Sequence, residues 1–149
     1  MDIRIKKFDD LSTAELYDIM VLRQEVFIVE QDCPYLDADG KDKDGWHVMI
    51  YDEESSLLMA YTRLLGPRIS YENYSSIGRV VSNHRGRGKG YGRQVMQESI
   101  KAILDLFPNN SIKISAQTYL LKFYNELGFK EVGEGYLEDG IPHMGMIRE

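Results

Sequence analysis

Cysteine is nearly absent from this sequence of 149 residues, and the single residue Cys33 excludes an intrachain disulfide. The first 10 residues alternate apolar and charged side chains, so they lack the apolar core of a secretory signal. No apolar run is long enough to cross a bilayer. These absences predict a cytoplasmic protein that has no membrane partner.

An excess of positive charge is also missing. Lysine and arginine together number 18 against 24 aspartates and glutamates, which gives a net charge of −6. General nucleic-acid binding draws on a basic surface, so the sequence predicts no nucleic-acid partner. The apolar fraction of 43% and the charged fraction of 28% are those of an ordinary globular protein. Because there is no repeat and no break in composition, residues 1–149 are expected to form one domain.

A metal site is not expected either. The segment Glu30–Gly45 is predicted to be a loop, and it carries the acidic residues Asp37, Asp39, Asp42 and Asp44. Their order departs from the Asp-x-Asp-x-Asp-Gly pattern of a calcium loop. We therefore expect a solvated acidic loop. We also expect Cys33 to be a small buried side chain and not an activated thiol.

The N-terminal part of the chain predicts a short strand followed by a helix. Ser12 and Glu15 have the spacing of a capping box, and apolar residues at helical spacing extend the helix over Thr13–Ile28. Arg23 lies on the apolar stripe of this helix. Its charge is therefore expected either at the rim of the fold or facing a pocket.

The rest of the chain predicts further strands and two further helices in a mixed α/β order. Helices are indicated over Arg93–Phe107 and along the stripe Leu120–Leu127, which Gly128 would cap. Asp139-Gly140 is a turn dipeptide. Strands are predicted at Trp46–Tyr51, Leu57–Leu65, Ser76–Val81, Ile112–Gln117, Phe129–Val132 and His143–Ile147.

The most informative motif is Arg87-Gly88-Lys89-Gly90-Tyr91-Gly92, which separates a predicted strand from a predicted helix. Glycine has no side chain, so an anion can come close to the backbone amides of such a loop. The unpaired N–H groups and the dipole of the first helical turn favour a phosphate at the same point. The motif therefore predicts a pyrophosphate site.

Two common nucleotide-binding motifs do not fit this loop. A P-loop needs Gly-x-x-x-x-Gly-Lys followed by Ser or Thr, whereas Gly90 follows Lys89 and Asn83 stands where the first glycine belongs. A Rossmann loop normally opens the first βα unit, whereas a helix and several strands precede this loop. Neighbouring basic residues support a local anion site, namely Arg79, Arg85, Arg87, Lys89 and Arg93.

Several strings of residues carry a resemblance to a known family. They are Val26–Tyr35 (VFIVEQDCPY), Ile77–Val81 (IGRVV), Ala116-Gln117, Phe123-Tyr124, Leu127–Phe129 (LGF) and Glu138–His143 (EDGIPH). With the glycine loop, these strings resemble the GNAT superfamily of acyl-CoA-dependent N-acetyltransferases. Within that superfamily the chain is similar to the ElaA-type proteins. The resemblance spans nearly the whole chain, and the longer strings are its most specific part.

The resemblance implies a mixed α/β fold in which helices flank a central, twisted, mostly antiparallel sheet with one splayed pair of parallel strands. It implies acetyl-CoA as the acyl donor, with the pantetheine arm between the splayed strands. A backbone amide near Val80 or Val81 would polarise the thioester carbonyl, and Gln117 would reach the pantetheine or the substrate. The residues implied at the pyrophosphate are Arg87, Gly88, Gly90 and Gly92, with Lys89 adding charge.

Amine acetylation sets two further demands, because an ammonium must lose a proton before it attacks and the departing thiolate must gain one. The resemblance implies Tyr124 as the general acid. The carboxylate that many family members place on the fourth strand is missing from Ser75–Val81. Glu30 and His143 stay open as candidates for the base or for orienting substrate, and His47 is a weaker candidate. A water relay is a further alternative.

The expected activity is transfer of an acetyl group to a primary amine of a small molecule or peptide, by direct attack in a ternary complex. The missing carboxylate keeps open a non-catalytic acyl-CoA-binding sensor. The segment Leu22–Phe27 also resembles the first helix of an acyl-homoserine-lactone synthase, although the glycine loop favours acetyl-CoA. The acidic loop suggests a cationic acceptor, and the sequence leaves a homodimer open.

Overall fold

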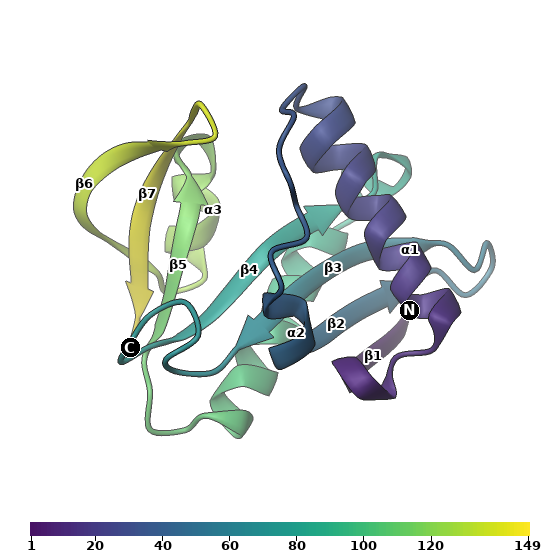
Figure 1. Cartoon of the computed structure of the whole chain (residues 1–149), viewed down its shortest axis with the longest axis horizontal. Coiled ribbons are helices and arrows are strands. Elements are labelled where there is room, and N and C mark those ends of the chain that lie inside the picture. Colours follow the sequence, from purple (N-terminus) through teal and green to yellow (C-terminus); the bar gives the residue numbers. More distant parts are fainter.

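The computed structural model describes all residues 1–149, and its centre is a seven-stranded sheet in the order β1-β2-β3-β4-β5-β7-β6 (Figure 1). Only the β4–β5 pair is parallel, and every other neighbouring pair is antiparallel. The predicted mixed α/β fold with a mostly antiparallel sheet is therefore confirmed. The strands are β1 (Asp2–Lys7), β2 (Trp46–Tyr51), β3 (Leu58–Leu65), β4 (Ser75–Ser82), β5 (Ile112–Gln117), β6 (Lys130–Glu138) and β7 (Ile141–Arg148).

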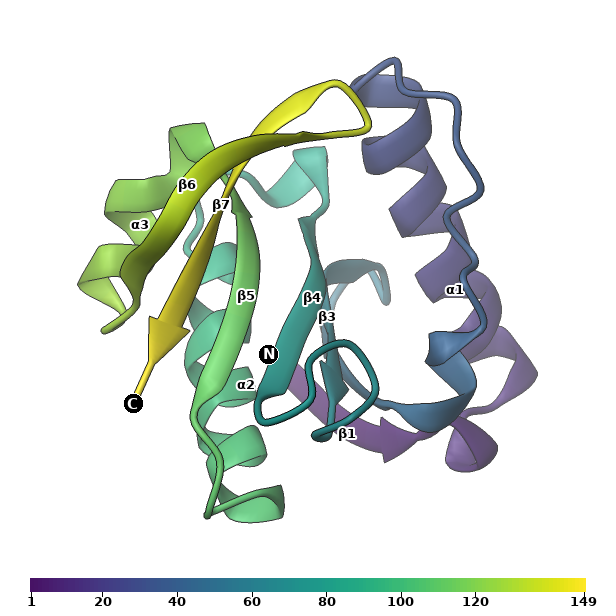
Figure 2. The same ribbon diagram turned by 60° about the vertical axis from the view of Figure 1, so that its left-hand side comes forward.

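Helices cover both faces of the sheet. The capping box of Ser12 and Glu15 opens α1 (Thr13–Arg23), which runs on as a π-helical turn, η2 (Gln24–Glu30). This helix lies on one face, while α2 (Tyr91–Leu106) and α3 (Leu121–Glu126) lie on the other (Figure 2). No helix has both the length and the apolar character needed to cross a membrane. Short 3-10 turns occur at η1 (Phe8–Asp10), η3 (Lys41–Asp44), η4 (His84–Gly86) and η5 (Thr118–Leu120).

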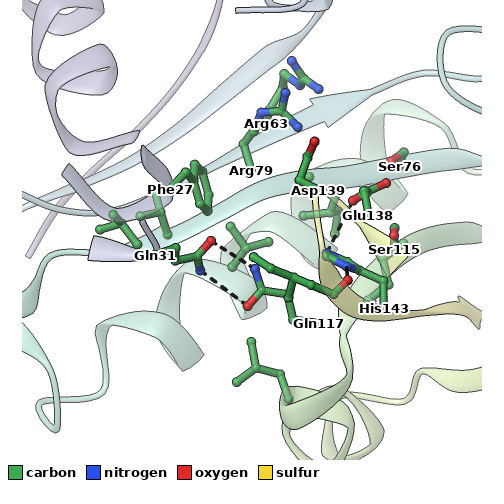
Figure 3. Close-up of a pocket in the computed structure, with 18 of the residues that line it drawn as sticks. Phe27, Gln31, Arg63, Ser76, Arg79, Ser115, Gln117, Glu138, Asp139 and His143 are labelled. Atoms are coloured by element: carbon green, nitrogen blue, oxygen red, sulfur yellow. Dashed lines mark hydrogen bonds and ion pairs between the residues drawn. The ribbon is translucent and has the colours of Figure 1, made fainter. Parts of the chain in front are cut away.

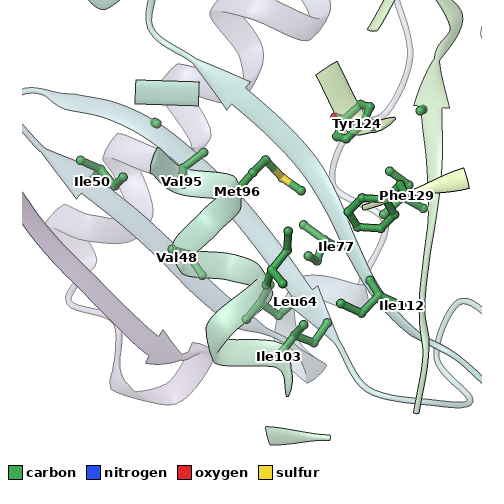
Figure 4. Packing of buried hydrophobic residues seen from close by; sticks show 14 of the residues in the cluster. Val48, Ile50, Leu64, Ile77, Val95, Met96, Ile103, Ile112, Tyr124 and Phe129 are labelled. Atoms are coloured by element: carbon green, nitrogen blue, oxygen red, sulfur yellow. The ribbon is translucent and has the colours of Figure 1, made fainter. Parts of the chain in front are cut away.

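The sheet divides the apolar core into two clusters, one on each face. The larger cluster packs α2 and α3 against the sheet, with Met96 and Phe129 almost fully buried at its centre (Figure 4). The smaller cluster packs Ile19 and Leu22 of α1 against Tyr61 of β3. Two packed faces hold the middle of the sheet rigid, so side chains at its edges have a fixed frame.

The parallel strands β4 and β5 pair only at their first residues. The register contains Ser75 opposite Ile112 and Ser76 opposite Lys113, and no pair beyond them. Figure 1 shows the two strands separating toward their carboxyl ends. The sheet therefore contains an opening between its two halves, and the predicted splay is confirmed.

The last two strands are longer than predicted. The sequence predicts Phe129–Val132 and His143–Ile147, whereas β6 and β7 extend to the turn at Asp139-Gly140. Most of β6 is exposed to solvent, so it lacks the alternation of apolar residues that marks a half-buried strand. A register shift between Val132 and Tyr136, at the left-handed residue Gly133, also interrupts the ladder.

Candidate active site

A cavity of about 940 Å³ occupies the opening between β4 and β5 (Figure 3). The two strands supply its sides, and η2 with the following loop supplies one wall. The β6–β7 hairpin and α3 close the remaining sides. Of the residues predicted to form a site, those lining the cavity are Glu30, Val80, Val81, Arg87, Gly92, Gln117, Tyr124 and His143. Gly88, Lys89 and Gly90 lie on the adjacent loop and do not line it.

The glycine loop presents backbone amides beside this cavity. Gly88 and Gly90 have left-handed backbone angles, φ 82° and φ 85°, which glycine adopts without strain. Neither of their N–H groups donates to a backbone acceptor in the chain. The first helical bond of α2 is Gln94 N–H to Gly90 O at 3.0 Å, so the N–H of Gly92 precedes it in the unpaired first turn. This arrangement suits an anion.

Packing against the protein does not require glycine at these positions of the loop. A Cβ atom built on Gly88, Gly90 or Gly92 would meet nothing within 4 Å, so the glycines face open space and not the protein core. Close approach of a phosphate to the backbone is the physical reason for side-chain-free residues at such positions.

The guanidinium of Arg87 lines the cavity and pairs with the carboxylate of Glu30. The guanidinium donates through both terminal nitrogens to the two carboxylate oxygens, with Nη2 at 3.0 Å from Oε2. Both side chains are partly exposed. The bond to Arg87 lowers the pKa of Glu30. A carboxylate with a lowered pKa is a weak base, so this pairing makes Glu30 a poor general base.

Strand β4 contains a bulge where it lines the cavity. Tyr61 pairs with Val81 and Arg63 pairs with Gly78, so Arg79 and Val80 together face Thr62 alone. A bulge leaves one residue out of the ladder of hydrogen bonds. Arg79 has φ 51°, a left-handed conformation that costs a non-glycine residue about 1–2 kcal/mol.

The prediction of a solvated acidic loop is wrong, because three arginines bind the carboxylates of this loop. Arg23 is fully buried and donates to Asp37 Oδ2 and to Asp42 Oδ1, each at 2.7 Å. Arg63, also buried, donates to Asp42 Oδ1 at 3.0 Å and to Asp39 Oδ1 at 2.8 Å. A buried charge is tolerated only when it is paired and hydrogen-bonded, and here both conditions hold.

Arg79 completes this network from the bulge. Its Nη2 donates to the backbone oxygen of Asp37 at 2.9 Å and lies 3.4 Å from Asp39 Oδ2. Its Nε lies 2.8 Å from Asp37 Oδ1, in an ionic contact without hydrogen-bond geometry. The prediction that Arg79 belongs to the basic cluster at the glycine loop is therefore wrong. Three guanidinium groups face three carboxylates, so the network is neutral.

The network changes the ionisation of its carboxyl groups. Burial disfavours the charged form of Asp39, but hydrogen bonds and charge from Arg63 outweigh it and lower the pKa of Asp39 to about 2. Burial opposes ionisation of Asp42 as well, and the hydrogen bond from Arg23 lowers its pKa nevertheless. Both groups are ionised at neutral pH.

His47 is a structural residue of this network and not a candidate base. It is fully buried and does not line the cavity. Its ring nitrogens lie 2.6 Å from the Tyr61 hydroxyl and 2.9 Å from the backbone oxygen of Asp42. Burial lowers the pKa of His47, which keeps the ring neutral. Sequence spacing alone gave no sign of these partners.

Tyr124 lies on α3, where it lines the cavity. It is 5% exposed and packs edge-on against Phe123 and Phe129. Burial raises the pKa of Tyr124, so the phenol keeps its proton at neutral pH. It is therefore both a core residue and a protonated group facing the cavity.

His143 lies on β7 with one ring nitrogen fixed and the other facing a carboxylate. Its Nδ1 is 2.7 Å from the backbone oxygen of Ile141, so Nδ1 carries the proton and donates it. Its Nε2 is 3.4 Å from Glu138 Oε2, and the ring stacks on Tyr136. This environment leaves Nε2 as the nitrogen that can take a proton in the neutral ring.

Two glutamines join the walls of the cavity. Gln31 follows η2 and Gln117 ends β5, and their side-chain amides make two long contacts (Figure 3). Nε2 of Gln31 lies 3.5 Å from Oε1 of Gln117, and Nε2 of Gln117 lies 3.4 Å from Oε1 of Gln31. Cys33 is half-buried and its Sγ donates to the backbone oxygen of Asp139 at 3.4 Å. Sequence reasoning did not single out Gln31 or Glu138 as site residues, because both depend on contacts between distant segments.

Comparisons with known proteins place the chain in a family. A family model described as an acetyltransferase (GNAT) domain matches residues 39–149. The chain therefore belongs to the GNAT acetyltransferase family. Protein ElaA of Escherichia coli is 40% identical over 140 residues, which cover 94% of this chain and 91% of ElaA. Within the family, the chain is ElaA-like.

Solved structures agree with this assignment. An acyl-CoA N-acyltransferase from Pseudomonas aeruginosa superposes with a TM-score of 0.92 at 42% identity, over 100% of both chains. Escherichia coli ElaA superposes with a TM-score of 0.91 at 36% identity, again over 100% of both chains. These similarities support the class of acyl-CoA-dependent acyltransferases for this chain.

More distant structures share the fold alone. An aminoglycoside 6'-N-acetyltransferase complexed with coenzyme A has a TM-score of 0.69 at 14% identity, over 97% of this chain and 96% of that one. The acyl-homoserine-lactone synthase LasI has a TM-score of 0.73 at 14% identity, over 98% and 88%. The fold therefore does not by itself separate amine acetylation from lactone synthesis.

The network of arginines and aspartates predicts a particular acid sensitivity. The pKa of Asp39 is about 2 in the folded protein, against about 3.9 in an unfolded chain. Because the folded value is lower, ionised Asp39 stabilises the fold above about pH 4, and this stabilisation is lost as the pH falls toward about 2. Urea denaturation between these pH values should show a steeper loss of unfolding free energy for wild type than for Asp39→Asn. The exposed Asp10 supplies a control variant, Asp10→Asn, and equal slopes for wild type and Asp39→Asn would contradict the role of the network.

Proposed function

We propose that this protein transfers an acetyl group from acetyl-CoA to a primary amine of a small molecule or peptide, by direct attack in a ternary complex. The observation that carries this proposal is the opening between β4 and β5, which has unpaired loop amides at one end and a protonated, buried tyrosine on its wall. Family membership supports an acyl-CoA donor.

The donor would lie along β4, with its diphosphate at the glycine loop. The amides of Gly88, Gly90 and Gly92 suit the phosphate oxygens, and Arg87 and Lys89 supply positive charge. The pantetheine arm would occupy the opening between the strands, where Gln117 offers an amide. The thioester would then reach the bulge at Val80 and Val81.

The chemistry needs a polarised carbonyl and an amine that has lost its extra proton. A backbone N–H of the bulge would donate to the thioester oxygen and stabilise the negative charge of the tetrahedral intermediate. The amine nitrogen forms a bond to the carbonyl carbon, and the carbon–sulfur bond then breaks. Coenzyme A leaves as a thiolate that must take up one proton.

Two residues are assigned to the proton transfers. Nε2 of His143 would take the proton that the amine loses, because Nδ1 is already committed to Ile141. The neutral phenol of Tyr124 would give its proton to the thiolate. Glu30 is the weaker candidate for the base, because Arg87 lowers its pKa and occupies both of its oxygens.

An acceptor screen tests the proposed function. Purified protein is incubated with acetyl-CoA and a panel of polyamines, amino acids, aminoglycosides and peptides, and free thiol is measured together with the mass of the product. Acetylated amine with an equal amount of coenzyme A is the expected result. Saturable binding without transfer would support a sensor, and a lactone formed from S-adenosylmethionine and an acyl donor would support a synthase; either result overturns the proposal.

Tyr124→Phe should separate acid catalysis from donor binding. Removing one hydroxyl leaves the packing against Phe129 in place, so the affinity for acetyl-CoA should change little. Loss of a general acid should lower kcat by about 100-fold. Tyr17→Phe removes a hydroxyl from an exposed tyrosine of α1 and serves as the control. An unchanged kcat in Tyr124→Phe would show that Tyr124 is structural only.

Glu30→Gln should strengthen the binding of coenzyme A. The substitution frees Arg87 from a competing carboxylate, and a partly exposed ion pair of this kind corresponds to about a two- to fivefold change in Kd. Calorimetry measures the change. Glu25→Gln, also in η2, removes a similarly exposed carboxylate near Arg85 and is the matched control. Weaker binding would contradict the competition between Glu30 and the ligand for Arg87, whereas a large fall in kcat at unchanged Kd would return Glu30 to the role of base.

A further inference from the structure

We propose that Arg79 is a positioning residue, whose ion pairs with Asp37 and Asp39 hold the β4 bulge in the shape that directs a backbone N–H at the thioester carbonyl. The inference rests on the proposed function, because it explains what directs the backbone N–H donor of that site toward the thioester. Arg79 itself would not touch the reacting atoms.

The backbone at Arg79 needs an external restraint. A residue with a side chain rarely adopts φ 51°, and the ladder to β3 does not restrain it, because Arg79 and Val80 share one opposite residue, Thr62. A glycine would adopt this angle freely but would also leave it freely. The position instead carries the longest cationic side chain, and its guanidinium is tied at three points.

The groups that hold Arg79 cannot easily move. Asp37 is buried and also binds Arg23 of α1 at 2.7 Å. Asp39 also binds Arg63 at 2.8 Å, and Arg63 is the residue of β3 that pairs with Gly78, directly before the bulge. The loop is therefore anchored to α1, β3 and β4 at once. The loop thus holds the bulge through Arg79 on β4 and through Arg63 on β3.

The charge of the network favours positioning over ligand binding. Arg23, Arg63 and Arg79 are balanced by three carboxylates, so no net charge is left to attract a substrate ion. Arg79 nevertheless lines the cavity together with Val80. A neutral, rigid cluster beside a reacting carbonyl preorganises a dipole without competing for the ligand.

The experiment uses acetyl-CoA labelled with ¹³C at the carbonyl as its probe, bound to the full chain. Isotope-edited infrared difference spectroscopy reports the carbonyl stretch, which moves to lower wavenumber when a hydrogen-bond donor polarises the bond. Calorimetry gives the Kd of each sample, and no acceptor amine is needed. The variants are Arg79→Ala, which removes the guanidinium, and Arg79→Lys, which keeps the charge but cannot reach Asp37 and Asp39 together.

The shift to lower wavenumber should be largest in wild type, smaller in Arg79→Lys and smallest in Arg79→Ala. The Kd of the variants should stay within about threefold of wild type, because Arg79 is not assigned to the ligand. Arg4→Ala is the matched control, since Arg4 also binds two carboxylates but lies on β1 and should keep the full shift.

A full shift in folded, ligand-binding Arg79→Ala would overturn the inference. If Arg79→Ala does not fold, Arg79→Lys decides, because a shift equal to that of wild type overturns the inference and a smaller shift supports it. Absence of acetyl-CoA binding by wild type would instead overturn the proposed function. Binding by wild type with an unshifted carbonyl would leave donor binding standing and remove the positioning role.

Discussion

The brief contact between two parallel strands is the constraint on which the rest of the structure depends. Strands β4 and β5 pair at their first two residues and then separate, although both belong to one sheet. Continued pairing would bring the backbones to about 4.8 Å and leave no cavity. The packed faces of α1 and of α2 with α3 hold the two halves of the sheet in place on either side of the opening. The bulge and the tyrosine of α3 face the space that the separation creates, and the glycine loop lies beside it.

Electrostatics then fixes the edges of that space. The acidic composition of the loop after η2 predicts a solvated loop, yet its carboxylates pair with arginines of α1, β3 and β4. Pairs of this kind hold a geometry more effectively than they raise stability, because desolvation offsets most of the attraction. The loop thus forms a fixed wall of the cavity. The pair of Arg87 and Glu30 is of a different kind, since both side chains are partly exposed.

The order of elements, most of their bounds and the position of the glycine loop followed from periodicity, capping residues and glycine spacing. Those signals are local, so one segment at a time suffices to interpret them. The ion network was misjudged, because Arg23, Asp42 and Arg63 are far apart in the sequence and nothing in the sequence pairs them. The bulge at Arg79 and the contact between Gln31 and Gln117 were not predicted for the same reason. Most of β6 is exposed, so it lacks the alternation of apolar and polar residues that marks a strand. Its length is evident only from its pairing with β7.

Backbone amide NMR with coenzyme A tests the central claim most directly, because it observes each N–H group separately. Titration of ¹⁵N-labelled protein should give saturable changes that are largest at Gly88, Gly90, Gly92 and Val80, with downfield proton shifts where an amide donates to the ligand. Amides of β1 and of the exposed part of β6 should stay where they are. Saturable changes centred outside the opening between β4 and β5, or no changes at millimolar coenzyme A, would contradict the account.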